Sequence, residues 1–212
     1  MKSLLIGKLA IVACLLGVYA DATAADVAAK PPTLSAPQLK ALLPKLQTGG
    51  YVFFFRHAAT DMFQLDDHPT IGDCTTQRPL SDEGRAQARM IGKAFHKQKI
   101  PVGVVLSSPF CRCVETAQLA FGRAAVDDSL FFATRLSAGE RKANAEKLRK
   151  NIARHPDAGS NTVIVAHNAN MMEAYGIWPN EEGDALLFKP DSNSPGQPIA
   201  EIPVGLWQGL IK

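Results

Sequence analysis

The chain has 212 residues, of which 46% are hydrophobic and 20% are charged, and its formal net charge is +3. This composition is typical of a soluble globular protein and excludes a disordered tail, a collagen-like repeat and a coiled coil. No long run of basic residues is present, so nucleic acid is not expected to be a partner. The 4 cysteines are too few for a disulfide-dense scaffold. One domain with a buried hydrophobic core is therefore expected.

Residues 1–24 are predicted to be a secretory signal peptide. Lys2 and Lys8 lie near the start, an apolar run follows at residues 9–19, and small residues end in Ala22-Thr23-Ala24. A charged start, a short apolar middle and an A-x-A site form this pattern, and the apolar run is too short to span a bilayer comfortably. Cleavage is expected after Ala24, which would place the mature protein in the periplasm without stable membrane insertion.

Two other processing patterns are present in the same segment. Val18-Tyr19-Ala20 is an alternative cleavage site, whereas Ile11-Val12-Ala13-Cys14 would be a lipoprotein site but is disfavoured because the apolar run continues past it. Residues 25–34 are mostly small and end near two prolines, so a flexible lead-in is expected there. Residues 35–212 are predicted to form the single folded domain.

Apolar strands and amphipathic helices alternate along this domain. YVFFFR at residues 51–56 and TVIVA at residues 162–166 are continuous apolar stretches rich in aromatic and β-branched residues, typical of strands buried on both faces of a sheet. Ser81 is a helix N-cap followed by two acidic residues. This alternation predicts an α/β domain. In chain order we expect a helix at residues 35–46, a strand at 51–56, a loop at 58–79, a helix from 81 to about 98, a strand at 102–106, helices at 109–121 and 140–155, a strand at 162–166, and further strands at 185–188 and 199–203.

Three of the expected strands are followed directly by cationic or imidazole side chains. Arg56 and His57 follow the first of them, Arg112 follows Ser107-Ser108-Pro109 after the second, and His167 follows the third. In open α/β sheets ligands bind at the carboxyl ends of strands, so these groups are expected to converge. Arginine matches phosphate with a planar fork of donors, and histidine can act as a nucleophile near neutral pH. The pattern predicts a phosphate site that contains a nucleophile. The sequence has no Gly-rich phosphate-binding loop with a lysine, so nucleotide binding of that class is disfavoured.

Four motifs lie in order around these residues. They are Arg56-His57-Ala58-x-Thr60, Leu80-Ser81-x-x-Gly84-x-x-Gln87-Ala88, Ser107-Ser108-Pro109-x-x-Arg112-x-x-Glu115-Thr116-Ala117, and a strand that ends in Ala166-His167. Together they resemble the histidine phosphatase superfamily, also called phosphoglycerate mutase-like, over about residues 48–178. Ala58 stands where many members have glycine. This variant and the stretch Asp73-Cys74-x-x-Gln77-Arg78 resemble an exported branch that includes lipopolysaccharide core heptose phosphate phosphatases.

The resemblance implies a three-layer α/β/α sandwich with a mostly parallel central sheet, and a phosphohistidine mechanism. His57 would attack phosphorus, while Arg56, Arg112 and His167 would hold the phosphoryl group and neutralise its charge. No metal ion and no cofactor is implied, because the cationic side chains supply the electrostatic stabilisation. His57 needs an unprotonated reacting nitrogen, so we expect a backbone carbonyl to hold the proton on its other nitrogen. Thr60 is a candidate substrate contact, with a loop hydrogen bond as the alternative.

The group that protonates the leaving oxygen is less explicit in the sequence. Glu173, six residues after His167, is the first candidate, and Asp61, Asp66 and Asp67 in the long loop are alternatives. An activated ester or a phosphoramidate would need no strong acid. A carboxyl group beside this pocket would have to stay protonated to serve as the acid.

The cysteines that follow the signal peptide are expected to meet an oxidising compartment, in which a disulfide persists. Cys111 and Cys113 are two residues apart on an expected helix and point in different directions, so a bond between them is disfavoured. A Cys74–Cys111 disulfide is expected instead, and it would fasten the long loop to the turn that presents Arg112. Cys113 is then expected to be a buried free thiol.

These observations predict an exported phosphatase that hydrolyses a small or sugar-linked phosphate monoester, with phosphorylated lipopolysaccharide core among the candidate substrates. Residues 58–79 and 176–198 are expected to line the rim of its site. The alternative within the same fold is a phosphomutase or a phosphoprotein phosphatase, which export disfavours because most of their substrates are cytoplasmic. The alternative from another class is a non-catalytic envelope protein that binds phosphate or a phosphosugar.

Overall fold

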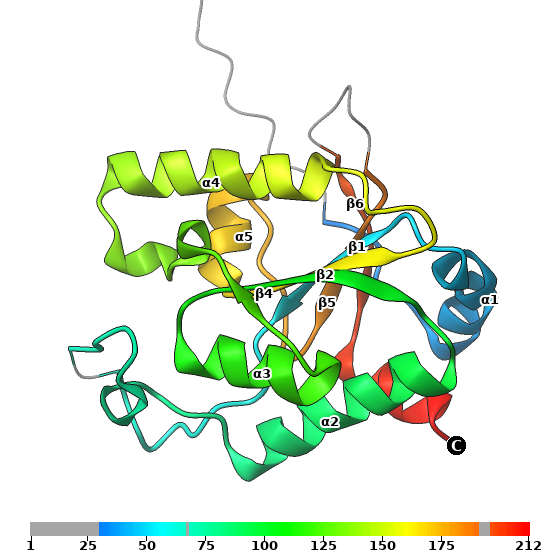
Figure 1. Cartoon of the computed structure of the whole chain (residues 1–212), viewed down its shortest axis with the longest axis horizontal. Coiled ribbons are helices and arrows are strands. Elements are labelled where there is room, and N and C mark those ends of the chain that lie inside the picture. The colour runs from blue at the N-terminus through cyan, green and yellow to red at the C-terminus, as the bar shows by residue number, and fades with distance from the viewer. Residues whose placement is uncertain (1–29, 67, 191–195) are drawn as a thin grey trace, which may run out of the picture.

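The computed structural model describes residues 30–66, 68–190 and 196–212, and these residues form a six-stranded mixed sheet with helices on both faces (Figure 1). The strands lie in the order β3-β2-β4-β1-β5-β6, and the first four run parallel. Strand β5 is antiparallel to β1, and β6 is antiparallel to β5. The predicted α/β fold with a mostly parallel sheet is therefore confirmed. The strands are β1 (Val52–Arg56), β2 (Val102–Ser107), β3 (Ala125–Val126), β4 (Asn161–Ala166), β5 (Ala185–Phe188) and β6 (Pro198–Ile202).

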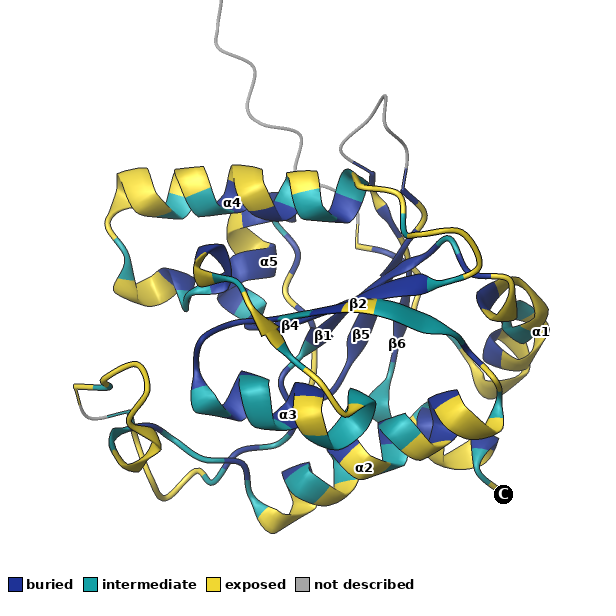
Figure 2. Cartoon of the chain, in the orientation of Figure 1, coloured by how far each residue is buried: buried dark blue, intermediate teal, exposed yellow. Residues whose placement is uncertain are grey.

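The helices form one layer on each face of the sheet. They are α1 (Ala36–Gln47), α2 (Asp82–Lys97), α3 (Cys111–Phe121), α4 (Ala138–Ala153), α5 (Asn168–Tyr175) and the 3₁₀ helix η4 (Val204–Leu210). Phe53 and Phe55 pack with α1, α2, α3 and η4, whereas Val52 and Phe54 pack with α4 and α5, because alternate residues of β1 point to opposite faces. All four side chains are buried, as the dark central strands of Figure 2 show. The three-layer α/β/α arrangement is thus confirmed.

The start of α2 lies directly against the loop that follows β1. Ser81 is the N-cap, and its Oγ accepts a hydrogen bond from the Gly84 backbone N–H at 3.0 Å. Gly84 packs on the backbone of Ala59, and a Cβ atom at this position would overlap the Ala59 carbonyl group. Because glycine has no Cβ, the helix can approach the loop this closely.

The observed elements lie within a few residues of those expected from the sequence, and the short strand β3 is an addition. The lead-in predicted to be flexible at residues 25–34 is ordered at its end. The backbone N–H of Leu34 donates to the Glu201 carbonyl, and the N–H of Glu201 donates to the Pro32 carbonyl, each at 2.9 Å. An edge strand such as β6 offers unpaired backbone groups, which explains this pairing. The folded domain therefore begins before residue 35.

The predicted signal peptide lies outside the described residues. No helix in the described part of the chain has the length and apolar character that a membrane span requires.

Candidate active site

The parallel strands bring the predicted site residues together at one edge of the sheet. Arg56 ends β1 and lies in register with Ala166, the last residue of β4. The His57 backbone N–H donates to the Ala166 carbonyl at 3.0 Å. As a result, the ring centroids of His57 and His167 lie 5.3 Å apart. The expected convergence of strand ends therefore produces one cluster.

His57 is buried, with 3% of its surface exposed, and its tautomer is fixed. Nδ1 lies 3.0 Å from the Ala58 carbonyl oxygen, which can only accept, so Nδ1 carries the proton. This confirms the predicted backbone carbonyl, and it leaves Nε2 with a free lone pair. Burial, and next the charge of Arg112, hold the pKa of His57 well below its usual value of 6.5. His57 is therefore neutral and in the form that a nucleophile needs.

His167 is fully buried and connects Arg112 to Ser108. Arg112 Nη2 lies 3.4 Å from His167 Nδ1, and Nδ1 must accept because a guanidinium group can only donate. Nε2 then carries the proton and donates to Ser108 Oγ at 3.0 Å. Burial, followed by the charge of Arg112, lowers the pKa of His167 well below 6.5. His167 thus orients the guanidinium group without adding a second positive charge.

Arg112 lies in the first turn of α3 and is fully buried. Its Nη1 donates to Asp66 Oδ1 at 3.1 Å. Its guanidinium carbon lies 4.7 Å from the ring centroid of Phe110 and 5.5 Å from that of Phe132, which are cation–π distances. Burial lowers the pKa of Arg112, but arginine stays charged at neutral pH. The guanidinium group therefore packs against two neighbouring aromatic rings, and Asp66 balances its charge.

A carboxylate that the sequence analysis did not single out, Glu182, lies beside His57 and Arg56. It accepts hydrogen bonds from the Thr60 backbone N–H at 2.8 Å and from Thr60 Oγ1 at 2.9 Å. Arg56 Nη2 donates to its Oε1 at 3.4 Å, and His57 Nδ1 lies 3.9 Å from the same oxygen. Thr60 therefore makes the loop hydrogen bond that was the alternative to substrate contact.

The position of Glu182 follows from the antiparallel strand β5. The Arg56 backbone N–H donates to the Asp184 carbonyl at 3.1 Å, and the Gly183 N–H donates to the His57 carbonyl at 2.9 Å. The residues that precede β5 must therefore lie beside the carboxyl end of β1. The acidic residues at positions 181–184 could indicate a carboxylate at the site, but only if the antiparallel direction of β5 is known.

A third guanidinium group, that of Arg78, also lies at the site, with Nη2 3.8 Å from Glu182 Oε1. In the described part of the chain, four buried side-chain nitrogens have no hydrogen-bond partner within the protein, and three of them are the Nε atoms of Arg56, Arg78 and Arg112. Buried donors without an acceptor are rare in native proteins. The three arginines therefore have donor capacity for an anion with several oxygens.

Glu173, the first candidate acid, does not reach this cluster. It lies on the outer face of α5, where its side chain is 39% exposed and its Oε1 accepts from Arg141 Nε at 3.0 Å. The opposite face of α5 is buried, and the helical period places Glu173 away from it. Asp61 accepts from the Phe63 backbone N–H, and Asp67 lies outside the described residues. The buried residues of α5 are Ala169, Asn170, Met171, Ala174 and Tyr175.

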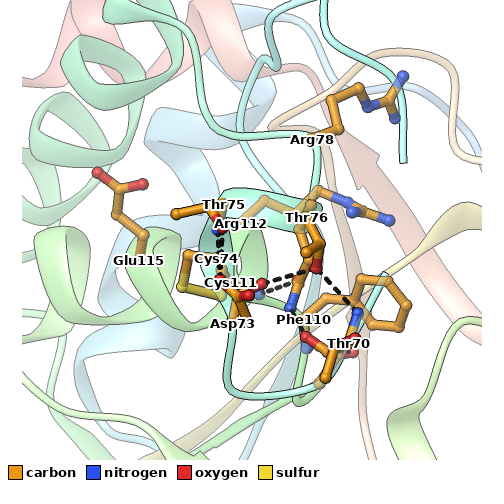
Figure 3. The surroundings of a disulfide bond; sticks show 12 residues. Thr70, Asp73, Cys74, Thr75, Thr76, Arg78, Phe110, Cys111, Arg112 and Glu115 are labelled. Carbon is orange, nitrogen blue, oxygen red and sulfur yellow. Dashed lines mark hydrogen bonds between the residues drawn. A yellow bond between two sulfur atoms is a disulfide. The ribbon is translucent and has the colours of Figure 1, made fainter. Parts of the chain in front are cut away.

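The predicted Cys74–Cys111 disulfide is present and fastens the long loop to the first turn of α3 (Figure 3). Gln77 supports the same junction, because its Oε1 accepts from the Cys111 backbone N–H at 2.8 Å and its Nε2 donates to the Thr70 carbonyl at 2.9 Å. Cys113 is a buried free thiol, as predicted, and burial raises its pKa to about 12. It is therefore a packing residue and not a nucleophile at neutral pH.

A cavity of about 540 Å³ opens beside the cluster. Arg56, Arg78 and Glu182 lie on its wall, together with the side chains of Glu181 and Gln87. The wall thus carries both hydrogen-bond donors and acceptors. A polar leaving group attached to a phosphoryl group at His57 would have room here.

Comparisons with known proteins agree with this architecture. Residues 52–130 match the family model of the histidine phosphatase superfamily, branch 1. A protein from Agrobacterium tumefaciens assigned as the phosphohistidine phosphatase SixA is similar at 17% identity over 73% of this chain and 98% of its own, with a TM-score of 0.50. A protein from Escherichia coli K-12 assigned as an alpha-ribazole-5'-P phosphatase is similar at 14% identity over 70% and 94%, with a TM-score of 0.53. A search of curated proteins gave no match. At these identities the structural likenesses establish the fold.

Proposed function

We propose that this chain is a member of the histidine phosphatase superfamily and hydrolyses a phosphate monoester through a phosphohistidine intermediate on His57. The observation that carries the proposal is the neutral His57 imidazole, with Nε2 free, beside three arginines whose buried Nε donors lack partners. A histidine nucleophile needs that protonation state, and a phosphoryl group in transfer needs donors for its oxygens.

In the first step, the Nε2 lone pair of His57 attacks phosphorus, and the bond between phosphorus and the leaving oxygen breaks. Arg56 and Arg112 donate to the non-bridging oxygens, on which negative charge accumulates. His167 holds Arg112 in position by accepting from its Nη2. The phosphorylated imidazole carries a positive charge through its Nδ1–H, which the Ala58 carbonyl oxygen and the nearby Glu182 carboxylate stabilise.

Glu182 replaces Glu173 as the proposed proton-transfer group. It lines the cavity that would receive the leaving group, whereas Glu173 is on the outside of α5. In its protonated form Glu182 gives a proton to the departing oxygen, and the resulting carboxylate can then accept a proton from the attacking water. Its hydrogen bonds from Thr60 fix the orientation of the carboxyl group.

In the second step, water attacks the phosphorus of phosphohistidine, and the bond between phosphorus and Nε2 breaks. Inorganic phosphate leaves, and His57 regains its lone pair. No metal ion and no cofactor takes part in this scheme, because the guanidinium groups supply the stabilising charge.

We further propose that the protein is exported to the periplasm and acts on a small or sugar-linked monoester, with phosphorylated lipopolysaccharide core as one candidate. The signal-peptide pattern at residues 1–24 supports export. The mixed donors and acceptors on the cavity wall suit a leaving group that carries several hydroxyl groups.

The test is to replace His57 by Ala and to measure the release of phosphate from a substrate panel that includes p-nitrophenyl phosphate and phosphorylated core oligosaccharide. The wild type should hydrolyse a monoester and retain labelled phosphate on the protein after rapid quenching, and His57→Ala should do neither. His155→Ala, at an exposed histidine, is the matched control and should behave as the wild type.

The alternatives give different results in the same experiment. A non-catalytic phosphate-binding protein would show neither turnover nor labelling in the wild type. A phosphomutase would return the phosphoryl group to a sugar hydroxyl and release little inorganic phosphate. Hydrolysis that survives His57→Ala would refute the mechanism.

A further inference from the structure

We propose that Arg78 is a third guanidinium ligand of the phosphoryl group, positioned by the disulfide-anchored segment at residues 73–78. This inference rests on the proposed function, because it assigns a further residue to the same site. Arg78 lies outside the four motifs that resemble the superfamily and ends the stretch Asp73-Cys74-x-x-Gln77-Arg78, which resembles the exported branch.

The first observation is that the Arg78 guanidinium group has almost no hydrogen bonds to the described residues, although its side chain is only 21% exposed. Its Nε is buried and has no partner among these residues. Nη1 contacts Met62 Sδ at 3.7 Å, which is a weak acceptor, and Nη2 is 3.8 Å from Glu182 Oε1, beyond hydrogen-bond length. A mostly buried guanidinium group with its donors unused is typical of a binding site for an oxyanion.

Arg56 and Arg112 differ from Arg78 in this respect. Arg56 donates to the Asn180 carbonyl at 3.2 Å and to Glu182 at 3.4 Å, and Arg112 donates to Asp66 at 3.1 Å. Their charges are thus partly balanced by hydrogen-bonded protein groups. Arg78 is the arginine of the three with the most donor capacity left for a ligand.

The second observation is that the charge of Arg78 acts on the whole cluster. It lowers the pKa of His57 and of His167, in addition to the larger effects of burial and Arg112. It also lowers the pKa of Arg56 and of Arg112. The Arg78 guanidinium group is therefore within electrostatic range of all four groups.

The third observation is that the segment before Arg78 is anchored to the helix that carries Arg112. Asp73 caps a short 3₁₀ turn by accepting from the Thr75 N–H, Cys74 forms the disulfide, and Gln77 accepts from the Cys111 N–H. The Arg78 and Arg112 side chains leave this junction toward the same side (Figure 3).

Asp66 provides a second connection between the two arginines. Its Oδ1 accepts from the Arg78 backbone N–H at 2.8 Å and from Arg112 Nη1 at 3.1 Å. Together, the disulfide and this carboxylate fix the backbone of Arg78 relative to the Arg112 guanidinium group. Such preorganisation is what a binding site for a phosphoryl group requires.

The experiment compares the wild type with Arg78→Ala and Arg78→Lys. Calorimetric titration with inorganic phosphate gives Kd, and steady-state hydrolysis of p-nitrophenyl phosphate gives kcat and KM. Arg78→Ala should weaken phosphate binding and raise KM by about tenfold or more, which is the usual effect of losing a charge-assisted hydrogen bond. Arg78→Lys should recover part of the loss, because it restores the charge but not the planar fork.

The matched control is Arg135→Ala. Arg135 is exposed and its Nη2 donates to the backbone carbonyl of Asp66 at 3.1 Å, so it holds the same loop without lying on the cavity wall. It should leave Kd for phosphate within about twofold of the wild type. Equal thermal melting temperatures would show that each variant folds.

Several outcomes separate this inference from the proposed function. Unchanged phosphate affinity and KM in Arg78→Ala, with His57→Ala inactive, would overturn the role of Arg78 and leave the phosphatase function intact. Equal losses in Arg78→Ala and Arg135→Ala would also overturn it, because they would show that Arg78 only holds the loop. A wild type that binds phosphate but hydrolyses nothing, with binding lost in Arg78→Ala, would support the role of Arg78 while the catalytic proposal fails.

Discussion

Removing the Cys74–Cys111 disulfide should both destabilise the protein and weaken its phosphate site. The two cysteines are 37 residues apart in the sequence. The loop-closure entropy that the bond removes from the unfolded chain corresponds to about 4 kcal/mol at 25 °C. For a domain of this size, that free energy of unfolding corresponds to a fall of about 10 °C in Tm.

A local effect should accompany this loss of stability. The disulfide joins η1 (Cys74–Thr76) to α3, and so it connects the segment of Arg78 with the helix turn of Arg112. Without the bond, the hydrogen bonds of Asp66 and Gln77 must hold the loop at the site without covalent support. The segment of Arg78 is then held less firmly relative to Arg112. We therefore expect KM to rise even at temperatures well below Tm, where the protein is still folded.

The assay measures Tm by circular dichroism, and kcat and KM at 25 °C, for the wild type with and without reductant. Replacing Cys74 and Cys111 together by Ser should reproduce the effect of the reductant and remove any further response to it. Cys113→Ala is the control, because this thiol is buried and unbonded, and the variant should keep the full response to reductant.

Two results would refute this reasoning. If thiol titration shows that the bond is reduced while Tm and KM stay unchanged, the disulfide contributes neither stability nor positioning. If Tm falls but KM for p-nitrophenyl phosphate stays the same, the bond stabilises the fold only, and its connection to the phosphate site is wrong.

Glu182→Gln should lower kcat by about a hundredfold or more for an alkyl phosphate, whose leaving oxygen needs a proton, and much less for p-nitrophenyl phosphate. The control Glu173→Gln should change kcat for neither substrate. Equal losses of kcat with both substrates in Glu182→Gln would argue against proton transfer. Because burial lowers the pKa of His57 and His167 well below 6.5, both should remain neutral in an NMR titration as the pH falls through 6.5, and signals that titrate at the usual value would contradict this. The same shifts imply that the unfolded state binds more protons than the folded state below pH 6.5. The free energy of unfolding should therefore fall as the pH is lowered below 6.5, by up to about 1.4 kcal/mol per pH unit for each histidine. Melting curves recorded over this pH range would measure the decrease.

The core of the site could be predicted because its residues are attached to strongly patterned elements. The apolar runs at residues 51–56 and 162–166 are too continuous for surface strands, so they had to be central. Their parallel pairing, with Arg56 beside Ala166, then places His57 and His167 at the same edge. Sequence pattern and strand topology are thus sufficient for this part of the site.

The carboxylates could not be predicted in the same way. Glu182 reaches the site because β5 runs antiparallel to β1, and strand direction has no signature in a short apolar run. Asp66 was one of three loop candidates, and only tertiary contacts distinguish it from Asp61. The expectation for Glu173 rests on its place in the chain, six residues after His167. The phase of α5, which buries the residues on its other side, was the available evidence against that choice.

The electrostatic balance of the site gives the long loop a role in the proposed catalytic cycle. Arg112 is fully buried, and a buried guanidinium group without a counter-charge is strongly destabilising. Asp66 supplies that counter-charge, but its carboxylate takes Arg112 Nη1, a donor that a phosphoryl oxygen would also use. The loop carboxylate therefore competes with the phosphoryl group of the substrate and with the phosphate product alike. Such competition weakens ground-state binding, and because it also favours product release, it suits an enzyme that must release phosphate after each cycle.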